Sequence, residues 1–306
     1  MFQGAPSSRV ATGVALLLTG IWGTTWGGVR ISLDGYPPLL GVSLRFAIAS
    51  LVLFFLAWRW RVSMRPNRRL LGLWLVQASC AFGLSYGLVY WAEQWVPSGL
   101  VAVLFSTLPL FVTLFAFPFL PAERLDGFGW IGLVAGFAGV AVIFSDDLAA
   151  LGGSQVRLAA MVVMLSPVAA GLAQVVVKRW GRDVHSLVIV APPMMMSAIS
   201  MALLSFWLER EHEIAGGLWP TVAVFYLALC GSALTFTLFF WLLQHVTAIR
   251  VSLIAFGTPV VAVIVGTLFL DEPLTVRMVL GALMVISGVA FVAVPPDSRP
   301  RFLRPS

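Results

Sequence analysis

The stretch CAFGLSYGLVYWAEQWVPSGL, residues 80–100, has a second copy in the chain, CGSALTFTLFFWLLQHVTAIR, residues 230–250. A shift of 150 residues gives ten identical residues among the 41 positions that begin at Cys80. The matches include residue types that are uncommon in apolar segments: Cys80 with Cys230, Trp91 with Trp241, Gln94 with Gln244, and Pro109 with Pro259. They indicate an internal duplication, with one repeat over residues 1–150 and a second over residues 151–306.

The composition places both repeats in a membrane. Hydrophobic residues make up 60% of the chain, charged residues make up 10%, and the mean hydropathy is +0.97; soluble domains are about a quarter charged. The net charge of +6 does not indicate a nucleic-acid partner, because the basic residues lie between apolar segments and not in one solvated cluster. We therefore expect an all-α polytopic protein whose surroundings are membrane lipids.

Ten apolar segments are long enough to cross a bilayer, which takes about 20 helical residues. We expect the spans at residues 12–30, 38–58, 70–92, 97–119, 127–145, 156–178, 185–208, 218–244, 247–269 and 275–294. Of the 19 basic residues, 14 fall on the side of the N-terminus. By the positive-inside rule, both termini and a basic tail are expected in the cytoplasm. Arg outnumbers Lys 18 to 1, which is associated with GC-rich bacterial genomes, so we expect the spans in a bacterial inner membrane.

Five spans in each repeat invert the second repeat relative to the first. Two inverted five-helix repeats around a central cavity are a signature of secondary transporters, which bind substrate near the middle of the membrane. This architecture resembles the drug/metabolite transporter superfamily, in particular its EamA-type branch. The resemblance is carried by the GIWGTTWG run at residues 20–27, Arg45, the helices around Pro109 and Pro259, and the hairpin residue Glu123 with its copy Glu272.

Within that branch, the chain looks most like the YddG-type exporters of aromatic amino acids and related metabolites. The resemblance implies a basket of ten helices in which the first, third, fourth, sixth, eighth and ninth spans line the cavity. The fifth and tenth spans are then expected to pack at the side, a position linked with dimer contact in such families. We expect a monomer or a weak homodimer.

The sequence offers little material for catalysis. The two cysteines lie inside apolar segments and the three histidines at span ends, which predicts no metal site, and no GxxxxGK[ST] phosphate loop is present. Every Asp and Glu falls at or beyond a span end, whereas ion-coupled carriers commonly place a carboxylate inside the membrane. We expect a transporter without a cofactor, in the simplest case a uniporter; coupling through Glu93 at the rim stays open.

Arg45 is the one charged residue well inside a predicted span. It is interpreted either as a site for a substrate carboxylate or as a structural group that caps carbonyls or pairs with a neighbouring helix end. Polar and aromatic residues also recur at spacings of three and four in the third span: Ser79, Gly83, Tyr86 and Tyr90. That spacing predicts one helix face suited to an amphipathic substrate, with an aromatic belt at the membrane surface as the alternative for Tyr90.

The remaining candidate residues lie at similar depth in other spans. The copied third span offers Trp241 and Gln244, the first span offers Trp22, Thr25 and Trp26, and the sixth offers Ser166 and Gln174. We expect them to form one pocket for a small molecule. Pro109 and Pro259 each remove a helix hydrogen bond in the middle of a span, which predicts either paired hinges for alternating access or fixed kinks that shape the cavity.

These observations favour an alternating-access exporter or uniporter of aromatic or other hydrophobic amino acids and related amphipathic metabolites. A proton-coupled drug or metabolite antiporter, or a carrier of phosphorylated metabolites, is an alternative within the same superfamily; phosphorylated substrates need several buried cations. A membrane-embedded enzyme or a scaffold is the alternative from another class. The sequence provides neither an interior carboxylate pair nor a histidine cluster for such an enzyme.

Overall fold

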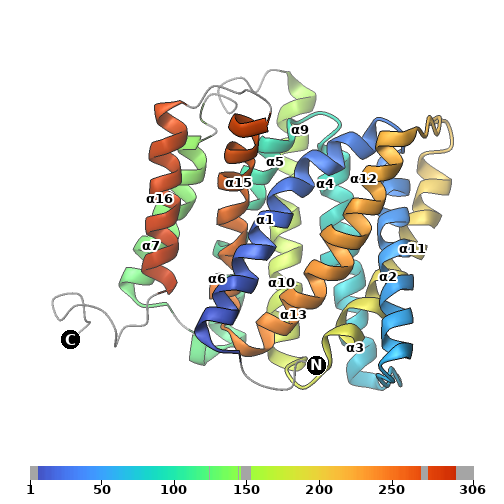
Figure 1. Cartoon of the computed structure of the whole chain (residues 1–306), viewed down its shortest axis with the longest axis horizontal. Coiled ribbons are helices and arrows are strands. Elements are labelled where there is room, and N and C mark those ends of the chain that lie inside the picture. The colour runs from blue at the N-terminus through green and yellow to red at the C-terminus, as the bar shows by residue number, and fades with distance from the viewer. Residues whose placement is uncertain (1–5, 124, 144, 146–152, 270–274, 294–306) are drawn as a thin grey trace.

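The structure is a computed structural model of the chain that describes residues 6–123, 125–143, 145, 153–269 and 275–293. Over these residues the chain is helical, and its helices stand side by side as a bundle (Figure 1). Glu272 and the basic C-terminal tail lie outside the described residues.

The first repeat forms five helical segments, several of them built from two or three pieces. They are α1 (Ser8–Leu33), α2 (Pro38–Arg59), α3 (Arg68–Val76) with η1 (Gln77–Leu84) and α4 (Ser85–Ala92), α5 (Ser98–Phe105) with α6 (Leu108–Phe119), and α7 (Gly127–Ile143). A short 3₁₀ turn, η2 (Pro121–Glu123), precedes α7. Side-chain caps start two of these helices: the Ser7 hydroxyl accepts from the Val10 N–H, and the Asn67 carbonyl accepts from the Leu70 N–H.

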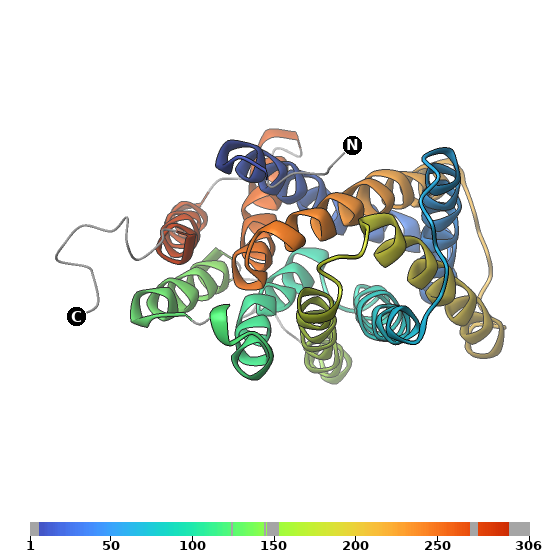
Figure 2. The ribbon, with the colours of Figure 1, turned by 90° about the horizontal axis from the view of Figure 1, so that it is seen from below.

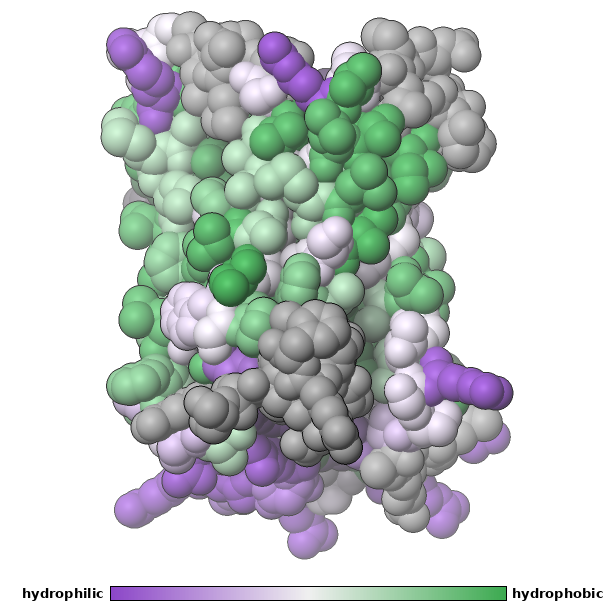
Figure 3. Space-filling model, turned by 90° about the vertical axis from the view of Figure 1, so that its left-hand side faces the viewer, coloured by the Kyte–Doolittle hydropathy of each residue, from purple (hydrophilic) through white to green (hydrophobic). Residues whose placement is uncertain are grey.

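The second repeat reproduces this series. It contains α9 (Ser154–Val163) with α10 (Leu165–Trp180), α11 (Ser186–Leu208), α12 (Leu218–Ala228) with η3 (Leu229–Leu234) and α13 (Thr235–His245), α14 (Ala248–Ser252) with α15 (Ile254–Phe269), and α16 (Val276–Ala293). Seven helical segments are long and apolar enough to cross a membrane, and three shorter apolar helices complete the ten. Figure 3 shows an apolar band on one face, with hydrophilic residues gathered most densely at its lower end.

The packing follows the inverted duplication. The first helix of each repeat lies against the fourth span of the other repeat: α1 packs on α15, and α10 packs on α6. The pairs α2–α11 and α7–α16 each join equivalent helices of the two repeats. Figure 2 shows the α7–α16 pair at one side of the bundle, as expected for the fifth and tenth spans.

Glycines bring α7 and α16 into backbone contact. A methyl group at Gly288 would lie 2.5 Å from the carbonyl oxygen of Gly132, and one at Gly281 would lie 2.5 Å from that of Gly139. No side chain fits at either position, so this side pair packs in the small-residue manner of membrane helices.

The two prolines occupy unequal positions. Pro109 is the second residue of α6, and the helix breaks at residues 106–107, directly after Phe105. Proline has no N–H, so Pro109 cannot donate a helix hydrogen bond to the Phe105 carbonyl four residues earlier. Pro259 lies inside α15, and the break in that span falls earlier, at Leu253. The expected pair of matched mid-span bends is therefore offset between the repeats; whether either acts as a hinge stays a prediction.

Candidate functional site

A cavity of about 100 Å³ lies between the two repeats. All six spans implied by the family resemblance contribute to its wall, and α2 adds Arg45. Seven aromatic side chains line it: Trp22, Trp26, Tyr86, Phe105, Phe236, Phe239 and Phe240. Its polar lining consists of Thr25, Arg45, Gln77, Ser85, Gln174, Ser252 and Thr258.

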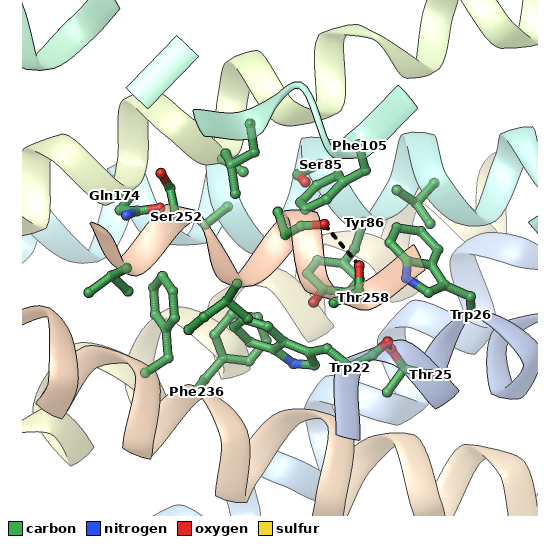
Figure 4. Close-up of a pocket in the computed structure, with 18 of the residues that line it drawn as sticks. Trp22, Thr25, Trp26, Ser85, Tyr86, Phe105, Gln174, Phe236, Ser252 and Thr258 are labelled. Carbon is green, nitrogen blue, oxygen red and sulfur yellow. Dashed lines mark hydrogen bonds between the residues drawn. The ribbon is translucent and has the colours of Figure 1, made fainter. Parts of the chain in front are cut away.

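The aromatic wall is built by rings in edge-on and tilted contact. The Trp22 ring centroid lies 5.3 Å from the centroids of both Phe236 and Phe239, and Trp26 meets Phe105 at 5.7 Å. Figure 4 shows Trp26 at one end of the pocket and Gln174 with Ser252 at the other. Aromatic rings offer large apolar faces, so this wall suits an amphipathic or aromatic ligand.

Two π-helical segments, η1 and η3, occur at matching places in the two repeats. The wide turns of η3 direct the Gly231 carbonyl oxygen toward two cavity residues: Arg45 Nη2 donates to it at 3.0 Å and Trp22 Nε1 at 3.3 Å. Single π turns inside α-helices are frequent at functional sites. Neither turn was expected from the apolar pattern of these spans.

Arg45 is 1% exposed, makes the structural contacts that were one of the two roles considered for it, and also lines the cavity. Its Nε donates to the Ser232 hydroxyl at 2.7 Å, so it caps the η3 turn, while its guanidinium carbon lies 4.7 Å from the Tyr86 ring centroid at the cavity wall. Among the described residues, Arg45 has no carboxylate within ion-pair distance. A buried cation without a close counter-ion is costly, so an anionic group that entered the cavity would stabilise it.

The structure places six of the eleven predicted binding residues in the cavity wall: Trp22, Thr25, Trp26, Arg45, Tyr86 and Gln174. Ser79 is exposed on the outer surface and donates to the Leu75 carbonyl at 2.6 Å. The reason is the wider turn of η1, which changes the helix register. The third span therefore lines the cavity with residues four apart, Gln77, Ala81, Ser85 and Val89, together with Tyr86, and Ser79 lies off that face.

The other four predicted residues lie behind the cavity wall or at its end. Tyr90 is fully buried against Gly41 on α2, and Ser166 lies 2.8 Å from the hydroxyl of the lining residue Ser85. Trp241 packs its ring against that of His245, and Gln244 donates to the Val184 carbonyl. These residues support the structure around the pocket without lining it.

Sequence reasoning missed several lining residues, including Gln77, Phe105, Phe239, Ser252 and Thr258. Gln77 carried a usable signal, because an amide inside an apolar span is costly unless it faces a partner or a cavity. The phenylalanines carried none, because the same residue type also covers the lipid-facing surface, as at Phe55 and Phe117.

Buried polar contacts gather beyond the Gln174 end of the cavity, here called the Lys178 end. Lys178 Nζ donates to the carbonyl oxygens of Leu243 at 2.6 Å and Val246 at 2.7 Å, and it lies 3.6 Å from Glu123 Oε1. Glu123 Oε2 accepts from the Ala248 N–H at 2.6 Å, and Gln174 Nε2 donates to the Ala248 carbonyl oxygen at 2.7 Å. These bonds connect α10, the η2 turn and the start of α14.

The opposite end, the Arg30 end, repeats part of this arrangement. Arg30 donates from Nη1 to the backbone oxygen of Glu93 at 2.9 Å. Glu93 and Leu243 are equivalent at the shift of 150. In each repeat, therefore, a cation at the end of the first span binds a backbone carbonyl at the end of the third span of the same repeat.

Glu93 is the residue that directly follows the span Arg68–Ala92, and it is 1% exposed. Neither carboxylate oxygen has a hydrogen-bond partner among the described residues. Burial raises the pKa of this carboxyl well above its ordinary value, and the nearby guanidinium groups of Arg30 and Arg45 oppose that shift only in part. A buried carboxyl is therefore present after all, at the Arg30 end of the cavity and not inside a span.

The fold and the cavity define a membrane carrier built from inverted repeats. The EamA-like transporter family model matches both halves of the chain, at residues 11–145 and 157–294, and the chain belongs to this family. It is a multi-pass membrane transporter and not an enzyme.

Similar proteins cover nearly the whole chain. The uncharacterized transporter YoaV of Bacillus subtilis is 29% identical over 285 residues, which cover 92% of this chain and 95% of YoaV. The uncharacterized inner membrane transporter YedA of Escherichia coli is 31% identical over 261 residues, 81% of this chain and 78% of YedA. A protein of known crystal structure superposes with a TM-score of 0.78 at 19% identity, covering 94% of this chain and 98% of the other, and this likeness concerns the fold.

Proposed function

We propose that this transporter moves aromatic or other hydrophobic amino acids, and related amphipathic metabolites, out of the cell by alternating access. The observation that carries the proposal is an aromatic cavity with one buried cation, Arg45, that has no carboxylate within ion-pair distance among the described residues. Such a site provides an apolar surface for a side chain and a charge for a carboxylate. The same lining supports the kinship with YddG-type exporters.

The cavity volume of about 100 Å³ is below the 300–1,000 Å³ or so of sites that hold drug-sized ligands. Binding of a whole amino acid therefore requires the surrounding helices to move apart, as alternating access demands. The breaks between α5 and α6 and between α14 and α15 lie in two of the lining spans. One chain contains the complete cavity, so a monomer suffices as the transport unit.

Counterflow in proteoliposomes tests this proposal. Labelled phenylalanine and tyrosine should exchange with saturable kinetics, and the matching amines phenethylamine and tyramine, which lack the carboxylate, should compete at least about tenfold more weakly, since a charge-assisted hydrogen bond is worth about 1.5–3 kcal/mol. Protein-free liposomes give the background. If no amino acid shows saturable flux, the proposed substrate class is wrong.

Glu93 favours a second candidate, proton-coupled antiport through the same cavity. Its buried carboxyl faces Arg30 from α1, Arg45 from α2 and Tyr90 from its own helix α4, so protonation changes the charge near the carboxylate site. An imposed proton gradient should then drive uphill uptake in vesicles, and Glu93→Gln should abolish that stimulation while counterflow persists. Counterflow without any effect of the gradient supports uniport.

A further inference from the structure

Gln77 is a buried glutamine whose side chain has no partner among the described residues. It is 0% exposed, begins η1 and lines the cavity, and neither its Oε1 nor its Nε2 forms a hydrogen bond with any residue that the structure describes. By contrast, Gln174 in the same wall donates to the Ala248 carbonyl oxygen. Buried amides are normally satisfied, and an unpaired one lowers stability, so Gln77 requires an explanation outside the fold itself.

Its place in the cavity identifies what it can meet. Gln77 and Tyr86 are nine residues apart on one helical span, and because the π-helical turns of η1 rise less per residue than an α-helix, their separation along the axis is at most about 13.5 Å, the value for 1.5 Å per residue. The Arg45 guanidinium lies over the Tyr86 ring, at 4.7 Å. Arg45 and Gln77 are thus separated along the cavity by a length that an extended aromatic amino acid bridges, with rings such as Phe236 in the wall between them.

We propose that Gln77 is a specificity-determining residue that pairs with a neutral group at the substrate end remote from the carboxylate. That group both donates and accepts a hydrogen bond, as a phenol hydroxyl or a carboxamide does, and it matches the one acceptor and the donor pair of the glutamine amide. The inference rests on the proposed function, which sets the carboxylate at Arg45. A substrate without such a group leaves the amide unpaired, and sites of this kind reject the analogue that lacks the polar group.

Matched substrate pairs in the counterflow assay test the proposal. Tyrosine against phenylalanine probes a phenol, and glutamine against methionine probes a carboxamide of similar length. In at least one pair the wild type should prefer the polar member by about tenfold or more. In Gln77→Leu that ratio should fall to within about twofold, mainly through weaker binding of the polar member.

Two further variants separate recognition from structural support. Gln77→Met conserves volume and should lose the preference as Gln77→Leu does, and both should unfold at the wild-type temperature or above, because they remove unpaired polar atoms. Gln244→Leu is the matched control, because Gln244 does not line the cavity: it should lower the unfolding temperature, since it breaks the bond to the Val184 carbonyl, and keep the preference.

Three results would overturn the inference: no preference in the wild type, a preference that survives in both Gln77 variants, or unfolding of both variants. The first two results are also those expected if the Gln77 amide hydrogen-bonds only water and does not contact the substrate. These results leave amino-acid transport standing, whereas absence of any saturable flux in the wild type removes the proposed function together with this inference.

Discussion

Replacing Lys178 by methionine removes a charge from the Lys178 end of the cavity while keeping most of the side-chain volume. Lys178 is 5% exposed and donates to the carbonyl oxygens of Leu243 and Val246 at 2.6 and 2.7 Å, with Glu123 Oε1 at 3.6 Å. In Lys178→Met both carbonyls lose a charged donor, and Glu123 loses its buried counter-ion.

The expected cost follows from these contacts. Hydrogen bonds to charged groups contribute about 1.5–3 kcal/mol each, and removing one partner of a buried ion pair costs about 3–5 kcal/mol. Glu123 retains the Ala248 N–H at 2.6 Å and Arg182 at 3.5 Å, and Arg182 is 57% exposed and so screened by solvent. We therefore expect the lower limit of that range, about 3 kcal/mol, which lowers the unfolding temperature by about 6 °C or more.

Thermal unfolding of the purified protein in detergent measures this change, and a double-mutant cycle with Glu123→Gln isolates the pair. The double variant should lose clearly less than the sum of the two single variants, since each single change already breaks the same contact. Arg69→Met is the control: Arg69 and Asp183 form an exposed ion pair, for which about 1 kcal/mol or less is expected. A Lys178→Met protein that unfolds within about 2 °C of the wild type, or strictly additive changes, would refute this reasoning.

Three further predictions concern single residues. Because burial raises the pKa of Glu93, the folded protein binds this proton more tightly than the unfolded chain, so stability should fall as the pH rises above about 4.3; Glu93→Gln should flatten that slope in thermal unfolding across pH. Gly288→Ala should lower the unfolding temperature, because the methyl group meets the α7 backbone, whereas Gly27→Ala, which meets nothing within 4 Å, should leave it unchanged or raise it. Arg45→Lys replaces a planar guanidinium that donates to both Ser232 and Gly231 by a single ammonium group. In counterflow, the apparent affinity for carboxylated substrates should fall about tenfold or more, and the apparent affinity for the matching amines should stay within about twofold.

The sequence predicts the coarse architecture well because hydropathy and duplication are properties of whole segments. The ten spans, the inverted repeats, the side pair α7–α16 and the central cavity are confirmed. Individual side chains were predicted less well because their direction depends on local helix geometry. A helical period of 3.6 residues put Ser79 on the cavity face, and the π-helical η1 rotates it away and brings Gln77 there instead.

The spacing of polar residues in the sequence also does not show which of them line the cavity and which support the structure around it. Gln174 lines the cavity and also donates a hydrogen bond to the carbonyl oxygen of Ala248, the first residue of α14. Gln244, which the sequence also predicted to bind substrate, donates to the Val184 carbonyl oxygen in a loop outside the cavity. The sequence signal is the same in both cases, an amide near the end of an apolar span. Both amides bond carbonyl oxygens of their own repeat, and the packing of the helices decides that Gln174 also faces the cavity between the repeats.

The inverted repeats place equivalent contacts at opposite ends of the cavity, and these contacts are unequal in strength. At one end, exposed Arg30 makes a single bond to the Glu93 backbone; at the other, buried Lys178 bonds two carbonyls beside a buried carboxylate. Each of these cations binds within its own repeat. Across the repeats, the Arg30 end is joined by Glu209, whose carboxylate accepts from the Leu39 N–H at 2.8 Å and the Leu40 N–H at 3.2 Å. At the Lys178 end the repeats are joined by Glu123, which accepts from the Ala248 N–H at 2.6 Å and lies 3.6 Å from Lys178 Nζ. Charged contacts thus join the repeats at both ends of the cavity, so each opening in the proposed alternating-access cycle breaks one set of them, and differential binding of substrate or an ion must supply that free energy.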